Sequence, residues 1–324
     1  MVKITIGANE AGQRTDRFLR KYLRQAPLSA VYRIIRRDLK VNGRRVRQET
    51  MLREGDELVL YLSGEELDGL TRPAKSVSVR KQFRVVYEDE AVLIADKPKG
   101  LLTHGDQKEK SNTLVNQVCG YLQEKGEHDP AAERTFRPAP VNRLDRNTSG
   151  LVIFGKTAEA LRLLTALLRE KDRIRKFYLT IVCGRLEKER VITDDLVKTE
   201  KGNCVHVRKG GEEGGKSALT RVRPLRTGKR FTLVEVELIT GRTHQIRVHM
   251  ANLGYPLAAD PKYGDPAVNR KLKQRNLTTQ LLHAGRLEFG DMPQELSGLS
   301  GKSLAARPPA VFLRAERELI DVGI

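Results

Sequence analysis

The segment 142–150, with the sequence NRLDRNTSG, contains the best candidate for a catalytic group. Its carboxylate, Asp145, lies between two guanidinium groups, those of Arg143 and Arg146. The preceding residues are Pro-rich and therefore extended, and the apolar run Leu151 to Phe154 that follows predicts a buried strand. We therefore expect Asp145 in a loop docked onto a sheet, a common place for catalytic residues. An aspartate that only pairs with its neighbouring arginines is the alternative, because structural ion pairs are common.

A second segment, 241–249, has the sequence GRTHQIRVH and offers two arginines, Arg242 and Arg247, in a stretch that predicts a strand. If Arg242 meets Asp145, the pair would keep that carboxylate ionised and oriented, since an opposite charge within about 4–6 Å favours the charged form. The two histidines have the spacing H-x-x-x-x-H without the glutamate of a zinc-protease helix, and no deaminase motif occurs. We therefore expect no metal site.

Residues 210–217, with the sequence GGEEGGKS, match the phosphate-binding loop pattern letter for letter. Such a loop works only where a helix follows it, because the helix N-terminus faces the phosphates. Here residues 218–223 alternate like a strand, and two glutamates would repel phosphate. A glycine-rich hairpin turn is expected instead, and no nucleotide cofactor.

The chain of 324 residues is strongly basic, with 60 Lys and Arg, 41 Asp and Glu, a net charge of +19 and a pI near 10.0. Such a surface predicts a polyanionic partner. Its apolar runs are far shorter than the roughly 18 residues of a spanning helix, and its first 18 residues lack the apolar core of a signal peptide. Three widely separated cysteines suit a reducing compartment. We expect a cytoplasmic monomer with no membrane partner.

Residues 1–62 are expected to form a small RNA-facing domain, with 14 Lys and Arg against 7 Asp and Glu, a net charge of +7. Thr15 and Ser29 are expected to cap two helices, and an Asn-Gly turn precedes a strand over 56–62. The second helix carries a basic face opposite its apolar one, formed by Arg33, Arg36, Arg37 and Lys40. A solvated basic face without a partner is the alternative.

Residues 63–82 are rich in Gly, Ser, Pro and Lys, which predicts a tether, and residues 83–324 are expected to form the second domain. Thr157 is expected to cap a leucine-rich helix. Alternating or apolar stretches predict strands over 83–87, 91–95, 151–154, 178–183, 204–207, 219–222, 232–238 and 245–248. This pattern indicates an α+β domain with a mixed, largely antiparallel sheet and flanking helices.

Five motifs occur in order along the chain: NRLDRNTSG, KFY at 176–178, GRTHQIRVH, LAADPKYG at 257–264 and LLHA at 281–284. Together they resemble the RluA-type family of RNA pseudouridine synthases over roughly residues 83–316. Residues 1–62 resemble, more loosely, the small alpha-L RNA-binding domain that precedes many members. The resemblance implies that uridine in a structured RNA is flipped out and isomerised without a cofactor, so that the ribose is joined to carbon 5 of uracil instead of its ring nitrogen.

The resemblance also implies roles for five residues. Asp145 matches the family's nucleophile, and Arg242 matches the arginine that pairs with it. Tyr178 matches the aromatic residue that stacks on the flipped uracil or acts as a base, although from the residues alone the KFY aromatics suit a sheet equally well. Arg143 matches a residue that wedges into the RNA. Leu282 matches an apolar wall beneath the base.

Two positions depart from the family pattern HRLDRDTSG, because Asn142 and Asn147 stand in place of His and Asp. Neither position is that of the nucleophile, so we expect them to affect RNA positioning or rate before the reaction itself. A different class of function also stays open, that of an RNA-binding ribosome-assembly factor with vestigial catalytic residues. Large-subunit ribosomal RNA is the expected substrate, and transfer RNA is the alternative.

Overall fold

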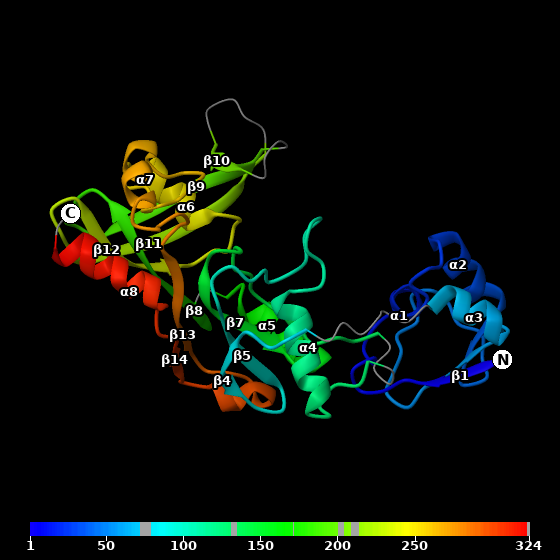
Figure 1. The fold of residues 1–324 in the computed structure, drawn as a ribbon. Coiled ribbons are helices and arrows are strands. Elements are labelled where there is room, and N and C mark those ends of the chain that lie inside the picture. The colour runs from blue at the N-terminus through cyan, green and yellow to red at the C-terminus, as the bar shows by residue number, and fades with distance from the viewer. Residues whose placement is uncertain (72–78, 131–134, 171, 200–203, 209–213, 323–324) are drawn as a thin grey trace. The chain divides into compact units, whose positions relative to one another are not determined.

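The computed structural model describes the whole chain except residues 72–78, 131–134, 171, 200–203, 209–213 and 323–324. The chain divides into two compact units (Figure 1). The N-terminal unit consists of Met1–Lys81, Asn116–Ala139 and Gly155–Arg162. The sheet unit consists of Gln82–Val115, Pro140–Phe154 and Leu163–Ile324. The predicted α+β class is confirmed.

A small antiparallel sheet and three helices form the first part of the N-terminal unit. The strands lie in the order β1-β3-β2, and their bounds are β1 Val2–Thr5, β2 Leu39–Val41 and β3 Glu57–Leu60. The helices are α1 Thr15–Tyr22, α2 Leu28–Arg37 and α3 Gly64–Thr71. Apolar residues at helical spacing, such as Phe18 and Leu19 of α1 and Ile34 and Ile35 of α2, are buried in one core with the strands.

The expectation that Thr15 and Ser29 cap the first two helices is wrong. Arg14 and Pro27 occupy the N-cap positions, and neither cap makes a side-chain hydrogen bond to its helix. The Thr15 hydroxyl instead donates to the carbonyl of Thr50 at 3.0 Å and so ties the start of α1 to a distant loop. A tertiary partner has therefore replaced the local one that the sequence suggested.

The predicted tether, 63–82, is helical in its first part. Ser63 and Glu66 form a capping box, in which the Ser63 hydroxyl oxygen accepts the Glu66 N–H at 3.1 Å and the Glu66 carboxylate accepts the Ser63 N–H at 2.8 Å. Leu67 of α3 is buried in the N-terminal core. Residues 72–78 of the predicted tether lie outside the described residues. We propose that the N-terminal domain extends beyond residue 62, through α3.

The described residues of the sheet unit include a mixed sheet of 11 strands in the order β10-β9-β11-β12-β8-β13-β7-β5-β4, with β14 beside β13 and β6 beside β7. Seven of the strand pairs are antiparallel, whereas β13 and β7 are parallel. The bounds are β4 Arg84–Glu88, β5 Val92–Lys97, β6 Ala139–Pro140, β7 Ser149–Gly155, β8 Ile174–Cys183, β9 Arg190–Lys198, β10 Val205–Val207, β11 Lys216–Thr227, β12 Phe231–Leu238, β13 Leu282–Phe289 and β14 Ser303–Ala305.

One predicted strand, 245–248, is wrong, because these residues begin helix α6, Gln245–Asn252. Every residue from Gln245 to Met250 is buried, polar ones included, so the polarity of the side chains carries no helical period. Val248 packs against Leu196, Val205 and Ala218 of the sheet. Burial on all sides therefore concealed the helix.

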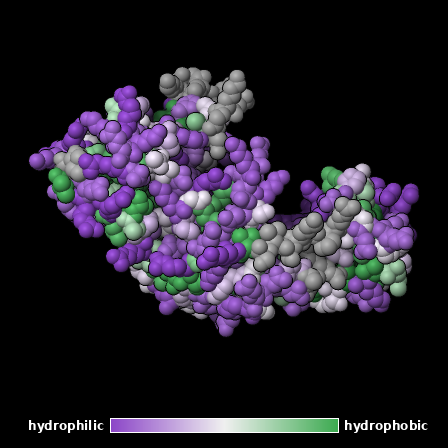
Figure 2. Space-filling model, viewed as in Figure 1, coloured by the Kyte–Doolittle hydropathy of each residue, from purple (hydrophilic) through white to green (hydrophobic). Residues whose placement is uncertain are grey.

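The remaining helices are α4 Leu114–Glu124, α5 Ala158–Leu167, α7 Pro266–Lys273 and α8 Ala310–Glu316, with a 3₁₀ helix η1 over Gln294–Leu299 and a π turn η2 over Arg317–Asp321. The predicted cap of α5 is confirmed, since the Thr157 hydroxyl oxygen accepts the Ala160 N–H at 3.1 Å. Among the described residues, no helix is long and apolar enough to cross a bilayer. Figure 2 shows mainly hydrophilic residues on the visible faces of both units.

The two faces of the sheet have different partners. Tyr178 of β8 pairs with Val236 of β12, and Ile181 pairs with Leu233. Since successive residues of a strand point to opposite faces, Tyr178 and Ile181 lie on opposite sides of the sheet. On the Ile181 side, α8 packs on the sheet through Phe312, as its position in Figure 1 also shows. The Tyr178 side carries the segments described below.

Gly150, at the start of β7, allows the Asp145 loop to lie against β13. Its φ is +112°, and a Cβ at this position would lie 2.2 Å from the carbonyl oxygen of Ala284. That distance is far inside van der Waals contact with backbone that cannot move without separating the two strands. Only glycine therefore fits where the Asp145 loop joins the sheet.

We predict that Gly150→Ala lowers the free energy of unfolding by roughly 3 kcal/mol or more, through backbone strain and overpacking. The same change at Gly120 is the control, because Gly120 lies inside α4 with open space around its Cβ position. There the substitution should raise stability by about 0.5–1 kcal/mol. Urea denaturation measures both, and equal effects at the two sites would contradict the close approach of β7 and β13.

Candidate active site

Asp145 lies in a turn that connects β6 to β7, and its two neighbours in the chain are held by the segment 97–103. On one side, the Thr103 hydroxyl makes two hydrogen bonds to Leu144, donating to its carbonyl at 2.9 Å and accepting its N–H at 3.2 Å. Thr103 is 3% exposed, so water competes little for these bonds. The backbone just before the carboxylate is thereby fixed.

On the other side, Lys97 and Gly100 hold the carbonyl of Arg146. The Lys97 ammonium donates to it at 3.2 Å and also to the carbonyls of Pro98 and Leu101, while the Gly100 N–H donates to it at 2.9 Å. Lys97 is completely buried. Burial lowers its pKa to about 7, although the negative charges of Asp145 and Asp96 act in the opposite direction. Three carbonyl acceptors match the three N–H donors of the ammonium form.

The Asp145 carboxylate pairs with Arg247, on the first turns of α6. Arg247 Nη1 donates to Asp145 Oδ2 at 2.9 Å. The other edge of the guanidinium makes a bidentate pair with Asp260, from Nε to Oδ2 at 2.7 Å and from Nη2 to Oδ1 at 2.8 Å. Arg247 thus bridges two carboxylates in a fixed plane, which a lysine could not do.

Arg247 and Asp260 form the buried base of this arrangement, and Asp145 is its accessible end. The side chains of Arg247 and Asp260 are 5% and 0% exposed, whereas that of Asp145 is 24% exposed. Burial by itself would raise the pKa of the Asp260 carboxyl, but the Arg247 contacts and the backbone N–H groups of Lys262 and Tyr263 lower it overall. Burial opposes the charge of Arg247, yet the two carboxylates raise its pKa overall. Both groups of the base are therefore charged at neutral pH.

The expectation that Arg242 pairs with Asp145 is wrong, because Arg247 holds that position. Arg242 Nε donates to the carbonyl of Ser217 at 3.0 Å, and its side chain is exposed. The segment predicts a strand, whereas its second half is helix α6, from which Arg247 reaches the carboxylate. The LAADPKYG motif contains Asp260, the second carboxylate that pairs with Arg247. This aspartate is the feature of the sequence that could have indicated Arg247.

His244 borders the carboxylate from another direction. It precedes α6 with a φ of +54°, and its Nε2 lies 3.7 Å from Asp145 Oδ2. Its Nδ1 is 2.9 Å from the Tyr263 hydroxyl, which accepts the N–H of Val205 at 2.9 Å. Burial lowers the pKa of His244 in spite of the nearby Asp145 charge, so the imidazole is neutral at neutral pH. A proton on Nε2 suits both ends, because it faces the carboxylate and leaves Nδ1 to accept from Tyr263.

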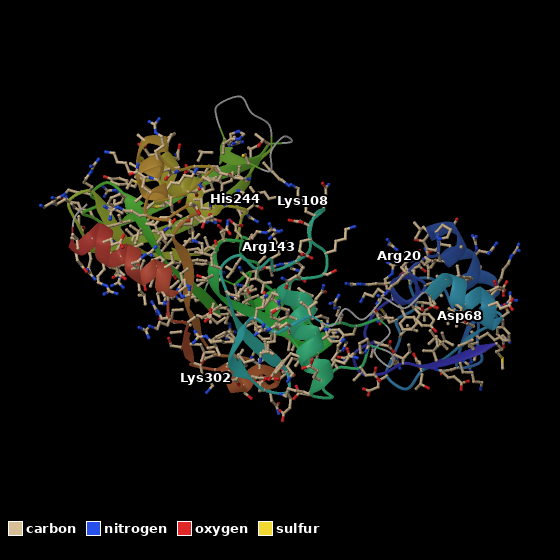
Figure 3. All side chains as sticks on the ribbon, in the orientation of Figure 1. Arg20, Asp68, Lys108, Arg143, His244 and Lys302 are labelled. Carbon is tan, nitrogen blue, oxygen red and sulfur yellow. The ribbon has the colours of Figure 1, made fainter. Side chains whose placement is uncertain are left out.

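These groups surround a pocket of about 60 Å³ that includes five of the residues that the sequence singled out. Its lining consists of Arg143, Leu144, Asp145, Thr148, Tyr178, Leu238, Arg242, His244, Gln245, Ile246, Arg247 and Leu282. Figure 3 labels Arg143 and His244, which lie near each other in the sheet unit. Tyr178 and Leu282 are 5% and 7% exposed and form the apolar interior, whereas Arg143 and Arg242 are exposed at the mouth.

Tyr178 is a neutral phenol in this pocket. Burial, and to a lesser degree the charge of Asp145, raises its pKa well above the ordinary value. A ring in this state offers an aromatic face for stacking. To accept a proton, its oxygen would first have to lose its own, which the Asp145 charge disfavours.

The structure explains one of the two asparagines that depart from the HRLDRDTSG pattern. Asn142 pairs with the backbone of β7, because its Oδ1 accepts the Ile153 N–H at 2.8 Å and its Nδ2 donates to the Leu151 carbonyl at 3.3 Å. An amide offers a donor and an acceptor on one group, as this edge of the strand requires. Asn142 thus has a local structural role. Nothing in the structure explains Asn147.

Two other predictions concern segments outside the pocket. On α2, Arg33, Arg36 and Arg37 are exposed, and Lys40 at the following strand lies over the Tyr61 ring at 5.4 Å. Their role in RNA binding stays a prediction. Residues 209–213 of the glycine-rich loop lie outside the described residues, and Lys216 begins strand β11, so the following segment is a strand, as predicted.

Comparison with known proteins identifies relatives of this chain. The sequence pattern of the family described as RNA pseudouridylate synthase matches residues 91–252. The ribosomal large subunit pseudouridine synthase C of Vibrio vulnificus (strain CMCP6) is 33% identical over 315 residues, which cover 93% of each chain. The protein of that name from Escherichia coli (strain K12) is 33% identical over 298 residues, covering 88% of each chain.

Solved structures agree on the fold. Human RNA Pseudouridylate Synthase Domain Containing 4 is 20% identical, with a TM-score of 0.57 over 72% of this chain and 92% of its own. Human RNA Pseudouridylate Synthase Domain Containing 1 is also 20% identical, with a TM-score of 0.54 over 76% of this chain and 89% of its own.

We predict that Arg247→Lys lowers the free energy of unfolding by about 3 kcal/mol, because Asp260 is then left buried with an incomplete partner. Arg242→Lys keeps the same charge at an exposed site and should change it by less than about 0.5 kcal/mol. Urea denaturation of the two variants beside the unmodified protein makes the comparison. A larger loss for the Arg242 variant would refute the assignment of Arg247 as the buried bridge.

Proposed function

This chain belongs to the RNA pseudouridylate synthase family, and we propose that it converts uridine to pseudouridine in large-subunit ribosomal RNA. The observation that carries this proposal is the partly exposed carboxylate of Asp145. It is held by a buried arginine, at a pocket lined by an aromatic and an aliphatic side chain. The arrangement can present one anionic oxygen to a base-sized ring.

The reaction breaks the bond between ribose C1′ and uracil N1 and forms a bond between C1′ and C5. A proton leaves C5, and N1 gains one, so the sum is an isomerisation without an external reagent. Asp145 would act as the nucleophile, either at ribose C1′ or at the uracil ring. Among the described residues, the side-chain contacts made to its carboxylate fall on Oδ2. We therefore assign the attack to Oδ1.

The remaining pocket residues account for holding the free base. Tyr178 and Leu282 would contact the uracil ring, and the neutral state of Tyr178 makes stacking its first role. Arg143 and Arg242 at the mouth would contact the RNA backbone or fill the space that the flipped nucleotide leaves. A pocket of about 60 Å³ is small for a nucleotide, so these exposed side chains must move when the base enters.

The choice of ribosomal RNA rests on the relatives, which are named for the large ribosomal subunit and match nearly the whole chain. Base flipping costs a few kcal/mol of unstacking, and a net charge of +19 supplies attraction to the phosphates. Transfer RNA carries the same phosphate charge, so charge does not distinguish the two RNAs. The substrate is therefore identified by mapping pseudouridine in cellular RNA.

The experiment compares pseudouridine at single-nucleotide resolution in cells that contain this protein, lack it, or contain only the Asp145→Asn variant. The expected result is the loss of one or a few sites in large-subunit ribosomal RNA in the second and third cases. Sites lost only from transfer RNA would redirect the substrate. If the variant restored growth and ribosome assembly while no site depended on the protein, a non-catalytic assembly factor would be the better description.

We further propose that the basic face of α2 binds RNA. Replacing Arg33, Arg36 and Arg37 with Gln should weaken RNA binding. The slope of the logarithm of the binding constant against the logarithm of the salt concentration should become shallower by about 2–3, since each phosphate contact contributes roughly 0.9 to that slope. The rate at saturating RNA should change little, because phosphate contacts position the RNA and take no part in the chemistry.

The matched control replaces Lys188, Arg190 and Lys229 with Gln, which removes the same charge from exposed positions of the sheet unit. Affinity at several salt concentrations distinguishes the two variants. Equal losses in both would show that only net charge matters, and not this helix.

A further inference from the structure

Thr148 carries a buried hydroxyl that none of the described residues satisfies. The residue is 2% exposed, and its Oγ1 has no hydrogen-bond partner among the described residues. A buried hydroxyl without a partner typically costs about 1–3 kcal/mol, so buried hydroxyls normally find one. An unpaired hydroxyl therefore points to a ligand that completes it.

The position of Thr148 connects this hydroxyl to the reaction. The Thr148 N–H donates to the carbonyl of Asp145 at 3.0 Å, so both residues belong to one tight turn. Both also line the pocket, together with Tyr178 and Leu282. The Thr148 hydroxyl is buried as the side chain stands, and rotation about the Cα–Cβ bond between staggered positions can turn it towards the pocket.

We propose that the Thr148 hydroxyl donates a hydrogen bond to a carbonyl oxygen of the flipped uracil and so orients the ring before and after it turns. This inference rests on the proposed function of the same pocket. Thr148 is only 2% exposed, whereas the side chain of Asp145 is 24% exposed, so the Thr148 hydroxyl is placed to meet the base and not the ribose phosphate. It is a positioning residue and takes no part in bond formation.

The symmetry of uracil explains why one hydroxyl suffices. Turning the ring by half a turn about the line through N3 and C6 exchanges N1 with C5 and the C2 carbonyl with the C4 carbonyl. A donor that binds one carbonyl in the substrate therefore meets the other carbonyl in the product, without moving. A hydroxyl can also accept a bond while the ring turns, which an ammonium or guanidinium group cannot do.

The first test compares Thr148→Val, which keeps the shape and removes the hydroxyl, with Thr148→Ser, which keeps the hydroxyl. With target RNA, the Val variant should lose about tenfold or more in kcat, the equivalent of one hydrogen bond, and the Ser variant should retain most of it. The Val variant should melt at the same temperature or about 1–3 °C higher, because it removes an unsatisfied buried group. Lower activity with undiminished stability is a result that a structural hydroxyl would not give.

The second test replaces the target uridine with 2-thiouridine or 4-thiouridine, since sulfur is a weaker acceptor than oxygen. At least one analogue should slow the unmodified protein several-fold and the Val variant much less. Equal slowing of both proteins by both analogues would overturn the contact with a carbonyl. If Thr148→Val is poorly folded, Thr148→Ala against Thr148→Ser gives the same comparison.

The outcomes separate this inference from the function on which it rests. If the unmodified protein forms pseudouridine and the Val variant does so equally fast, the role of Thr148 is overturned and the function stands. If the unmodified protein forms none with any cellular RNA, the proposed function fails, whatever the variants do.

Discussion

The bridge that Arg247 makes between Asp260 and Asp145 is the interaction on which the site depends. Asp260 is completely buried and is tied to two backbone N–H groups, so it fixes the guanidinium plane. The guanidinium then fixes one oxygen of Asp145, the only partly accessible member of the three. Charged groups buried in this way repay their desolvation only when every partner is in place. The proposed nucleophile is therefore positioned from the interior of the sheet unit, although it lies in a loop.

The backbone of the loop is held independently of its carboxylate. Lys97 at the end of β5 and Thr103 shortly after it hold the residues on either side of Asp145 through hydrogen bonds. Gly150 then brings the end of the loop against β13. A loop that is fixed at both flanks and at its exit gives its middle residue little freedom, which lowers the entropic cost of presenting that residue to a substrate.

Much of this architecture could be predicted from patterns of two kinds. Strands such as Thr232 to Leu238 and the helix after Thr157 follow ordinary periodicity, and the order of the motifs located Asp145, Tyr178 and Leu282 in one pocket. The pairing of Asp145 could not be predicted in the same way. It depends on whether the segment at 245–248 is a strand or a helix, and a segment buried on all sides has no polarity period that would decide between them. The hydrogen bonds from Thr103 to Leu144, and the lack of a partner for the Thr148 hydroxyl among the described residues, depend on the tertiary structure. No local sequence pattern predicts them.

The three charges of the bridge sum to −1, from two carboxylates and one guanidinium, in a chain whose net charge is +19. The Asp145 end of the pocket is therefore less favourable for a phosphate than the mouth, where the exposed side chains of Arg143 and Arg242 attract one. The electrostatic potential therefore orients an approaching nucleotide, because its neutral ring can enter the pocket while its phosphates stay at the mouth. The same electrostatics that bring RNA to the protein thus decide which end of the nucleotide reaches the carboxylate.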